Sequence, residues 1–438
     1  MSFNSLIFLF FFLPVFFFVF FITPIKYRYL VLFIFSIIFY FYCGLFNGIL
    51  LVIVALSNYF LARLCKKNNI VFYLSIILNI AVLALFKYNK SLLLPLGISF
   101  YTFNNISYLI DIKKNKIIAE KNLLRFFTYE FLFTHVTMGP IVNYNEINNS
   151  LFKLNPSFSE VADGFKRFLN GLIKKVLFAD NLGILYQNLY TASVTDSSML
   201  LCWLCIIVFA IQLYLDFSGY TDMALGLGKM IGITYPENFD YPYLATSISD
   251  FWRKWHMSLT NFFKNYVYIP LGGNRVKKLC QLRNILIVWI LTGIWHGSTF
   301  NFLLWGLYYG IILILEKYFI NKYIQKLPKF LKHFYVIFFV LIGYVFFSIT
   351  DFNSIFVFMR KLFSGPIINN AFLFYLKENI FLLFIGLLLC LKIPNYFKQI
   401  KNNKIVSYLI MFGYIFMYFL IIAYILSGNY QPFLYNNF

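Results

Sequence analysis

Two histidines, each beside a tryptophan, are the side chains of this sequence best suited to proton-transfer chemistry. His256 ends the stretch Asp250-Phe-Trp-Arg-Lys-Trp-His, and His296 lies in Gly293-Ile-Trp-His-Gly. The chain has only four histidines, and 61% of its residues are hydrophobic. An imidazole can take and return a proton near neutral pH. An ionisable side chain within a membrane is costly and marks a functional site. We therefore predict a site role for both histidines.

Each histidine also has a less specific interpretation. His296 ends the mostly apolar stretch Ile285–Trp295, so its Trp-His pair could simply anchor a helix end at the membrane surface. His256 could lie on a polar helix face against lipid headgroups, which its basic neighbours favour. The carboxylate of Asp250 would gain nothing from an anionic surface, and it therefore favours a site at this position.

The composition of the chain is that of a membrane protein. Its 438 residues include 22% aromatic and only 12% charged side chains, and the mean hydropathy is +0.75. Apolar stretches run end to end, which predicts one integral membrane domain over residues 1–438. The net charge of +21 falls in clusters between these stretches, as expected for the cytoplasmic loops of a protein in a lipid bilayer. We expect no nucleic-acid partner, because no basic face on a soluble fold is visible.

Stretches of roughly 20 apolar residues are long enough to cross a bilayer. The candidates lie near residues 3–23, 27–43, 46–64, 71–87, 92–110, 124–142, 199–219, 282–297, 299–319, 334–350, 378–395 and 405–427. The segment Gly164–Tyr190 is amphipathic, and it could lie at the membrane interface or form a further short span.

The region 216–275 departs from this pattern. It contains five of the sixteen acidic residues together with three prolines and several glycines, and no clean span fits it. Irregular polar backbone at membrane depth is tolerated only inside protein or beside a water-filled cavity, so we predict re-entrant or broken helices around a central site. Gly219, between Asp216 and Asp222, suggests a helix break. These two carboxylates could serve glycoside chemistry or satisfy the backbone of the broken helix.

A helix start is visible inside this region. Ser247-Ile-Ser-Asp250 has the pattern of a capping box. The pattern predicts a helix from there to about Tyr266, ending before Pro270. Along that helix, positions Ser249, Arg253, His256 and Thr260 would share one face.

Signals of metal-dependent or cofactor-dependent soluble enzymes are missing. The sequence has no Gly-x-Ser-x-Gly elbow, no phosphate-binding loop and no convincing dinucleotide fingerprint. Cys202-Trp-Leu-Cys205 has a metal-like spacing, but there is no second pair and no histidine nearby. We therefore predict no metal site and no bound cofactor.

Several stretches, taken together, resemble the membrane-bound O-acyltransferases. The resemblance is strongest to the bacterial branch that O-acetylates alginate or peptidoglycan or transfers D-alanine to teichoic acid. The stretches follow the family order over about residues 94–306: Leu94–Phe103, Met138–Val142, Gly171–Val176 with Ala179-Asp180, Asp216–Asp222, Asp250–Leu259, Tyr268–Arg275 and Gly293–Gly297. Any one of them would be a weak signal, but the set is highly specific.

The resemblance implies an all-α integral membrane fold. In this family about 11–13 tilted helices form a ring around a thin central region, with re-entrant helices and a through-tunnel. It also implies that His296 is the catalytic histidine and that His256 is the second histidine of the site. The chain departs from the family where Thr134-His135-Val136 replaces a Pro-Gln pattern and where Lys264-Asn265 replaces an Arg-Asp pair.

The chemistry implied by the resemblance is acyl transfer across the cytoplasmic membrane of a bacterium. The donor would be an acyl thioester, acetyl-CoA or an acyl carrier protein, and the acceptor a hydroxyl of an extracytoplasmic glycan, reached directly or through an esterase-like partner protein. Neutral His296 would act as general base, while His256, Arg253 or Asn301 orients the acyl group or stabilises the oxyanion. The predicted substrate-binding residues are Asp250, Trp252, Arg253, Trp255, Asn301, Asp216, Tyr220 and Asp222.

Two other functions stay open at this point. D-alanyl transfer from a carrier protein to teichoic acid would use the same class of site. A transporter or flippase for a lipid-linked or anionic substrate would also explain a polar, broken-helix region and basic loops, although no internal repeat is visible in the sequence.

Overall fold

The computed structural model describes residues 2–89, 91–135, 137, 139–392 and 404–428, and the regular structure in these residues is entirely helical. The chain divides into two compact units. The first comprises Met1–Gly171, Tyr220–Glu237 and Asn261–Tyr266, and the second comprises Leu172–Gly219, Asn238–Thr260 and Val267–Phe438.

Eight helices in the described part of the chain are long and apolar enough to cross a membrane. They are Ile25–Tyr42, Leu45–Cys65, Asn69–Tyr88, Met199–Met230, Lys278–His296, Phe300–Ile324, Lys329–Ser348 and Ile405–Leu426. A pair bent by 65°, Asn370–Glu378 and Ile380–Leu389, would make nine if it forms one broken span. The polytopic all-α class is thus confirmed, while the ring and the tunnel remain predictions.

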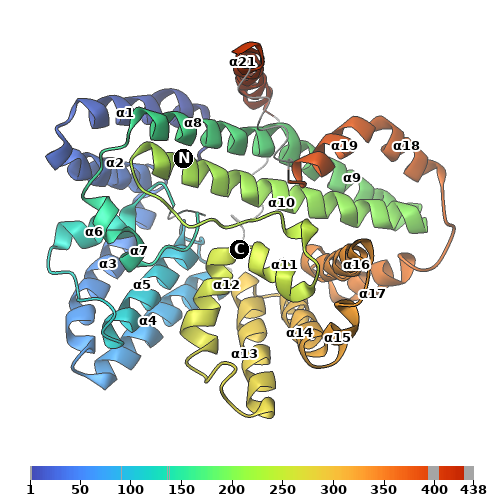
Figure 1. Cartoon of the computed structure of the whole chain (residues 1–438), viewed down its shortest axis with the longest axis horizontal. Helices are drawn as coiled ribbons and strands as arrows, with labels where there is room; N and C mark the ends of the chain where they lie inside the picture. Colours follow the sequence, from blue (N-terminus) through green and yellow to red (C-terminus); the bar gives the residue numbers. More distant parts are fainter. Residues whose placement is uncertain (1, 90, 136, 138, 393–403, 429–438) are drawn as a thin grey trace. The chain divides into compact units, whose positions relative to one another are not determined.

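The first unit is built from the N-terminal helices (Figure 1). They are η1 (Phe8–Phe12), α1 (Leu13–Ile22), η2 (Ile25–Tyr27), α2 (Arg28–Tyr42), α3 (Leu45–Cys65), α4 (Asn69–Tyr88), α5 (Ile98–Lys113), α6 (Leu123–Phe131), α7 (Tyr144–Leu151) and α8 (Phe158–Leu172). Helices α3 and α4 are joined by reciprocal amide hydrogen bonds of 3.1 and 2.8 Å between Asn58 and Asn79. Such interhelical polar pairs suit helices that pack within a membrane.

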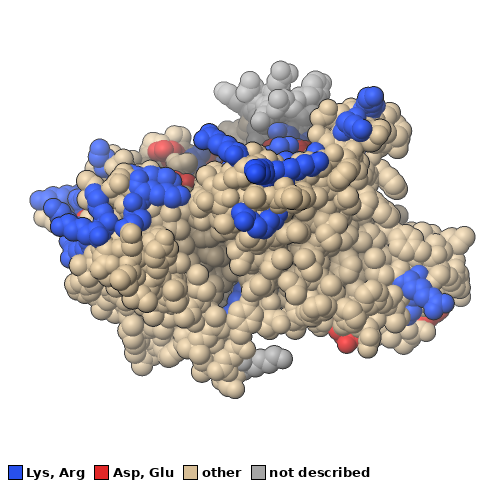
Figure 2. Space-filling view, turned by 90° about the horizontal axis from the view of Figure 1, so that it is seen from below, with Lys and Arg blue, Asp and Glu red and all other residues tan. Residues whose placement is uncertain are grey.

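The outer surface of α4 is apolar, with Ile70, Tyr73 and Leu74 each more than half exposed. Figure 2 shows Lys and Arg side chains in separate groups between broad areas that carry neither sign of charge. Large uncharged surfaces of this kind are expected where a protein contacts lipid.

Two of the predicted spans in this unit are wrong. The stretch 124–142 is helical only to Phe131, and residues 132–135, 137 and 139–142 are not helical. A Cβ on Gly139 would lie 2.6 Å from the Cα of His135. The stretch 92–110 becomes helical only at Ile98, because Gly97 with φ 72° turns the chain into α5. Nearly all of α5 is buried, so it is a core helix rather than one that faces lipid.

The second unit contains the remaining helices. They are η3 (Ile173–Ala179), α9 (Asp180–Thr195), most of α10 (Met199–Met230), η4 (Pro242–Leu244), α11 (Ile248–Lys254), α12 (Met257–Phe263, shared with the first unit), η5 (Lys264–Tyr268, also shared with it), α13 (Lys278–His296), α14 (Phe300–Leu315), η6 (Glu316–Ile320), α15 (Asn321–Ile324), α16 (Lys329–Ser348), α17 (Phe352–Lys361), α18 (Asn370–Glu378), α19 (Ile380–Leu389) and α21 (Lys404–Leu426).

The predicted helix break at Gly219 is also wrong, because α10 continues without interruption from Met199 to Met230. The helix tolerates Asp216 in its interior because the carboxylate pairs with Lys175 at 2.7 Å. The amphipathic segment Gly164–Tyr190 is helical throughout, in the successive helices α8, η3 and α9.

Candidate active site

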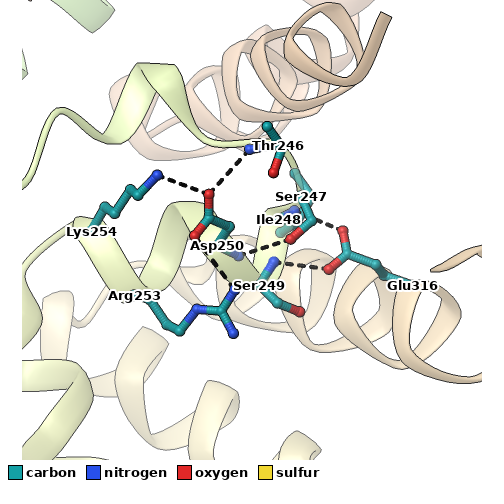
Figure 3. Close-up of polar contacts among 8 residues, drawn as sticks. All are labelled: Thr246, Ser247, Ile248, Ser249, Asp250, Arg253, Lys254 and Glu316. Atoms are coloured by element: carbon teal, nitrogen blue, oxygen red, sulfur yellow. Dashed lines mark hydrogen bonds and ion pairs between the residues drawn. The ribbon is translucent and has the colours of Figure 1, made fainter. Parts of the chain in front are cut away.

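The predicted capping box opens helix α11. The Ser247 hydroxyl accepts a hydrogen bond from the Asp250 amide at 3.0 Å, and the Asp250 carboxylate accepts one from the Thr246 amide at 3.2 Å (Figure 3). The Ser247 half of the predicted capping box is therefore confirmed, whereas Asp250 accepts from the Thr246 amide and not from the Ser247 amide that a capping box would use.

A buried carboxylate that the sequence analysis did not identify completes this helix start. Glu316, the first residue of η6, accepts hydrogen bonds from the amides of Ile248 at 2.7 Å and Ser249 at 2.9 Å (Figure 3). A negative charge at a helix N-terminus is stabilised by the amide dipoles there. The sequence feature that could have identified Glu316 is its position as an isolated acidic residue near the end of the apolar stretch 299–319.

The charged side chains of α11 form a local network in which only Arg253 is largely exposed. Asp250 pairs with Lys254 at 2.9 Å and with Arg253 at 3.4 Å, and the Arg253 side chain is 69% exposed. Partial burial acts to raise the pKa of Asp250, but hydrogen bonds from Lys254 and the Thr246 amide, with the charges of both basic residues, outweigh it and leave the pKa below its ordinary value. Asp250 is therefore an anion engaged in local pairing.

The predicted continuous helix from Ser247 to Tyr266 is wrong. Helix α11 ends at Lys254, and α12 begins at Met257. Between them His256 adopts φ 44°, a left-handed conformation that is uncommon for a residue with a side chain. The shared helical face of Arg253 and His256 therefore does not exist.

Asn238 holds this break in place. Its Oδ1 accepts hydrogen bonds from the Ser258 amide at 3.1 Å and the Ser258 hydroxyl at 2.9 Å, and it lies 3.1 Å from Nδ1 of His256. Because an amide N–H must donate, this Asn238 atom is an oxygen, and Nδ1 of His256 must carry the hydrogen. The neutral His256 ring therefore has its basic lone pair on Nε2.

Aromatic side chains enclose the His256 ring, which is 2% exposed. Its centroid lies 4.8 Å from Phe217, edge to face, and 6.2 Å from Trp295. The residue lies between the short helices α11 and α12, outside the eight candidate spans. Burial lowers the pKa of His256 to about 3, so its imidazole is neutral at physiological pH.

His296 is the last residue of α13 and is 3% exposed. Its ring centroid lies 4.7 Å from Trp295, 4.8 Å from Trp305 and 5.2 Å from Phe347, in each case close to edge to face. The ring is therefore packed within the protein, and the interpretation as an anchor at the membrane surface does not fit it.

Small residues bring α13 and α14 close enough to form this environment. A Cβ on Gly293 would lie 2.4 Å from the carbonyl oxygen of Phe302, and one on Gly306 would lie 2.4 Å from that of Trp289. Glycine at both positions allows the two backbones to touch, as is common where membrane helices pack. The connection between α13 and α14 is three residues long, so His296 faces the beginning of α14.

The predicted residue Asn301 lies in the first turn of the neighbouring helix, α14. Its Nδ2 donates to the carbonyl oxygen of Phe346 at 3.0 Å, and its Oδ1 has no hydrogen-bond partner within the described part of the chain. One half of this amide therefore ties α14 to α16, and its oxygen is left to accept a hydrogen bond.

The two predicted tryptophans of α11 have different surroundings. Trp252 packs against Trp289, Trp305 and Tyr309 at centroid distances of 4.6, 5.6 and 4.8 Å. Trp255 instead stacks on Phe251 at 5.6 Å. Trp252 thus belongs to the same aromatic cluster as Trp305, whose ring also contacts His296.

Asp216 belongs to a buried ion cluster. Lys175, 1% exposed, lies 2.7 Å from both Asp216 and Asp180, and neither carboxylate side chain is more than 5% exposed. Lys175 lies in the π-helical turn η3. Asp216 therefore balances the buried charge of Lys175 and links α10 to η3.

Tyr220 and Asp222 fall in the first unit, apart from the unit that contains both histidines. The Asp222 carboxylate accepts from Nε of Arg167 at 3.0 Å, and Arg167 also binds Glu237 at 2.6 Å. The Tyr220 hydroxyl is hydrogen-bonded to Thr137. The second unit thus contains His256, His296 and Trp252.

The model of the membrane-bound O-acyltransferase family matches residues 113–359. The chain belongs to this family and is an O-acyltransferase, as the motifs predicted.

Similar bacterial proteins have names that refer to alginate, peptidoglycan or teichoic acid. The chain is 33% identical over 380 residues to a probable alginate O-acetylase of Azotobacter vinelandii, a match that covers 79% of this chain and 75% of the relative. It is 35% identical over 328 residues to a peptidoglycan O-acetyltransferase of Helicobacter pylori, covering 64% and 62%. It is 27% identical over 247 residues to a teichoic acid D-alanyltransferase of Bacillus subtilis, covering 53% and 62%.

Proposed function

We propose that this protein transfers an acetyl group from a cytoplasmic thioester to a hydroxyl of an extracytoplasmic cell-envelope glycan. His296 is the general base, and it takes the hydroxyl proton as the oxygen attacks the thioester carbonyl. A positioned base of this kind contributes about 10²–10⁴-fold to the rate. The protein lies in the cytoplasmic membrane of a bacterium. The acceptor is peptidoglycan or a secreted polysaccharide, reached directly or through an extracytoplasmic esterase-like partner.

The observation that supports this proposal best is the environment of His296. The ring lies at the end of α13, nearly inaccessible, among Trp295, Trp305 and Phe347. An imidazole held among aromatic rings beside the acceptor hydroxyl is placed to take its proton. Exclusion of water also protects a thioester from hydrolysis.

The acetyl group is favoured by the relatives whose names specify a reaction. The alginate and peptidoglycan enzymes are O-acetylating and are 33% and 35% identical to the chain, against 27% for the D-alanyltransferase. D-alanyl transfer from a carrier protein remains the second candidate, because the same base would serve it. Membership of an acyltransferase family argues against the transporter or flippase interpretation.

The test is acetyl transfer by the His296→Ala variant. Purified protein in lipid vesicles is given radiolabelled acetyl-CoA, and release of the CoA thiol and labelling of peptidoglycan or alginate fragments are followed. We expect the variant to insert and purify normally but to lose transfer. His333→Gln is the matched control, because His333 lies outside the two histidine motifs and its Nδ1 contacts the Ala245 carbonyl. Near-normal transfer by His296→Ala would refute the assignment.

A further inference from the structure

The groups that the sequence suggested for oxyanion stabilisation have other hydrogen-bond partners in the structure. The Arg253 guanidinium is 69% exposed and pairs with Asp250. The Asn301 Nδ2 donates to the Phe346 carbonyl, and Nδ1–H of His256 is directed to Asn238. A donor for the thioester oxygen must therefore be sought among other side chains near His296.

An aromatic cluster next to His296 contains such donors. The indole N–H groups of Trp252 and Trp305 and the hydroxyl of Tyr309 are buried, and none of the three has a hydrogen-bond partner among the residues that the structure describes. Their rings lie close together, with centroid distances of 5.6 Å between Trp252 and Trp305, 4.8 Å between Trp252 and Tyr309, and 5.3 Å between Trp305 and Tyr309.

Three unpaired donors in one buried cluster require an explanation. A buried donor without an acceptor loses its hydrogen bonds to water and gains nothing in return. Tyrosine and tryptophan normally find a partner when they are buried. A bound group that carries oxygen acceptors but no donors, such as a thioester or an ester carbonyl, would supply the missing partners.

The position of Trp305 beside His296 indicates which oxygen of a bound group its N–H would contact. Its ring centroid is 4.8 Å from that of His296, with the planes at 80°, and both rings contact Phe347. Trp305 is 2% exposed. A carbonyl attacked by an alcohol that His296 deprotonates must lie near the His296 ring, and Trp305 is the member of the three whose ring contacts His296.

We propose that the Trp305 indole N–H, supported by Tyr309, donates a hydrogen bond to the carbonyl oxygen of the acyl thioester and to the oxyanion that develops from it. This inference rests on the proposed function. The hydroxyl oxygen bonds to the carbonyl carbon while its proton passes to His296. The carbon–sulfur bond then breaks, the electron pair leaves on sulfur, and the imidazolium returns the proton to the thiolate. Trp305 and Tyr309 are neutral donors throughout.

Trp305→Phe tests this role, because it removes the N–H and keeps an aromatic ring. With acetyl-CoA as donor, we expect kcat to fall by about 10²–10³-fold, the usual effect of deleting an oxyanion donor, with little change in KM. Trp203→Phe is the matched control, since the Trp203 N–H already donates to the Leu362 carbonyl at 2.9 Å. It should affect thermal stability rather than turnover.

A second variant decides the matter if Trp305→Phe fails to fold. Tyr309→Phe removes one oxygen atom and should lower kcat by about tenfold. Full turnover of whichever variant is folded overturns the inference. Equal CoA release by the wild type and His296→Ala would instead overturn the proposed function. Loss of release in His296→Ala with wild-type turnover in Trp305→Phe would overturn the Trp305 role alone.

Discussion

The imidazole of His256 lies 6.2 Å from the indole of Trp295, measured between ring centroids. Trp295 directly precedes His296, and the rings of these neighbours are 4.7 Å apart. One indole therefore contacts both histidines. The two motifs meet through packing, so the position of the helix break at His256 affects the environment of His296.

Asn238 fixes that position, and its removal is our first prediction. In Asn238→Leu, the Ser258 amide and hydroxyl and the His256 Nδ1–H lose their common acceptor. Unpaired buried donors cost about 1–3 kcal/mol each. We expect acetyl transfer to fall at least about tenfold and the melting temperature to drop. In Asn238→Asp the carboxylate can still accept all three hydrogen bonds, so the loss of transfer should be smaller. Wild-type transfer by Asn238→Leu would show that the tautomer and position of His256 are unimportant.

Glu316 anchors the other end of α11, and its removal is our second prediction. Glu316→Ala deletes the acceptor of the Ile248 and Ser249 amides. Hydrogen bonds to charged groups contribute about 1.5–3 kcal/mol each. We expect a clear fall in melting temperature and slower acetyl transfer, because Trp252 is carried by this helix. Glu378→Ala removes an exposed carboxylate and should change stability by less than about 0.5 kcal/mol. Equal melting temperatures for the two variants would contradict the anchoring role.

The sequence predicted those parts of the site that depend on local patterns. The cap that Ser247 forms with the Asp250 amide is local chemistry, and it formed as expected, although Asp250 accepts from Thr246 and not from Ser247. The positions of most membrane spans could also be predicted from the apolar stretches. The two histidines stood out because ionisable groups are rare in such a chain.

The parts that were missed depend on contacts between distant segments. The left-handed conformation of His256 is stabilised by Asn238, eighteen residues away. Glu316 reaches α11 across 67 and 68 residues. Gly219 suggested a break in α10, but the partner that keeps Asp216 within an intact helix is Lys175, 41 residues upstream. No pattern of local propensity contains such partners.

Lys175 is the subject of our third prediction. In Lys175→Met, the buried carboxylates of Asp180 and Asp216 lose the ammonium that lies 2.7 Å from each. Removing one partner of a buried pair costs about 3–5 kcal/mol, because the remaining charge is uncompensated. We expect little folded protein in membranes by fluorescence-detected gel filtration. Lys166→Met, at an exposed lysine, should express normally.

Neutralising the carboxylates tests the cause of this loss. A triple variant with Lys175→Met, Asp180→Asn and Asp216→Asn contains no uncompensated charge at this position. It should recover folded protein relative to Lys175→Met alone. A triple variant that is no better folded than the single one would mean that the Lys175 stem, and not its charge, matters.

Glu130 gives our fourth prediction, which concerns pH. The carboxyl lies in α6, outside the candidate spans, is fully buried, and accepts a hydrogen bond from Nδ2 of Asn105 at 3.1 Å. Burial raises the pKa of Glu130 to about 8, against a smaller lowering by the Asn105 hydrogen bond. An unfolded glutamate has a pKa of about 4.3.

The sign of the effect follows from proton binding. Between pH of about 4.3 and 8 the folded chain keeps a proton on Glu130 that the unfolded chain has lost, so this group makes stability fall as pH rises. The slope is at most about 1.4 kcal/mol per pH unit and levels off above the folded pKa. Glu130→Gln retains an acceptor for Asn105 and cannot ionise. Melting temperatures measured from pH 5 to 9 should therefore decline less steeply in Glu130→Gln than in the wild type. Parallel curves would mean that Glu130 ionises in the folded protein much as it does in water.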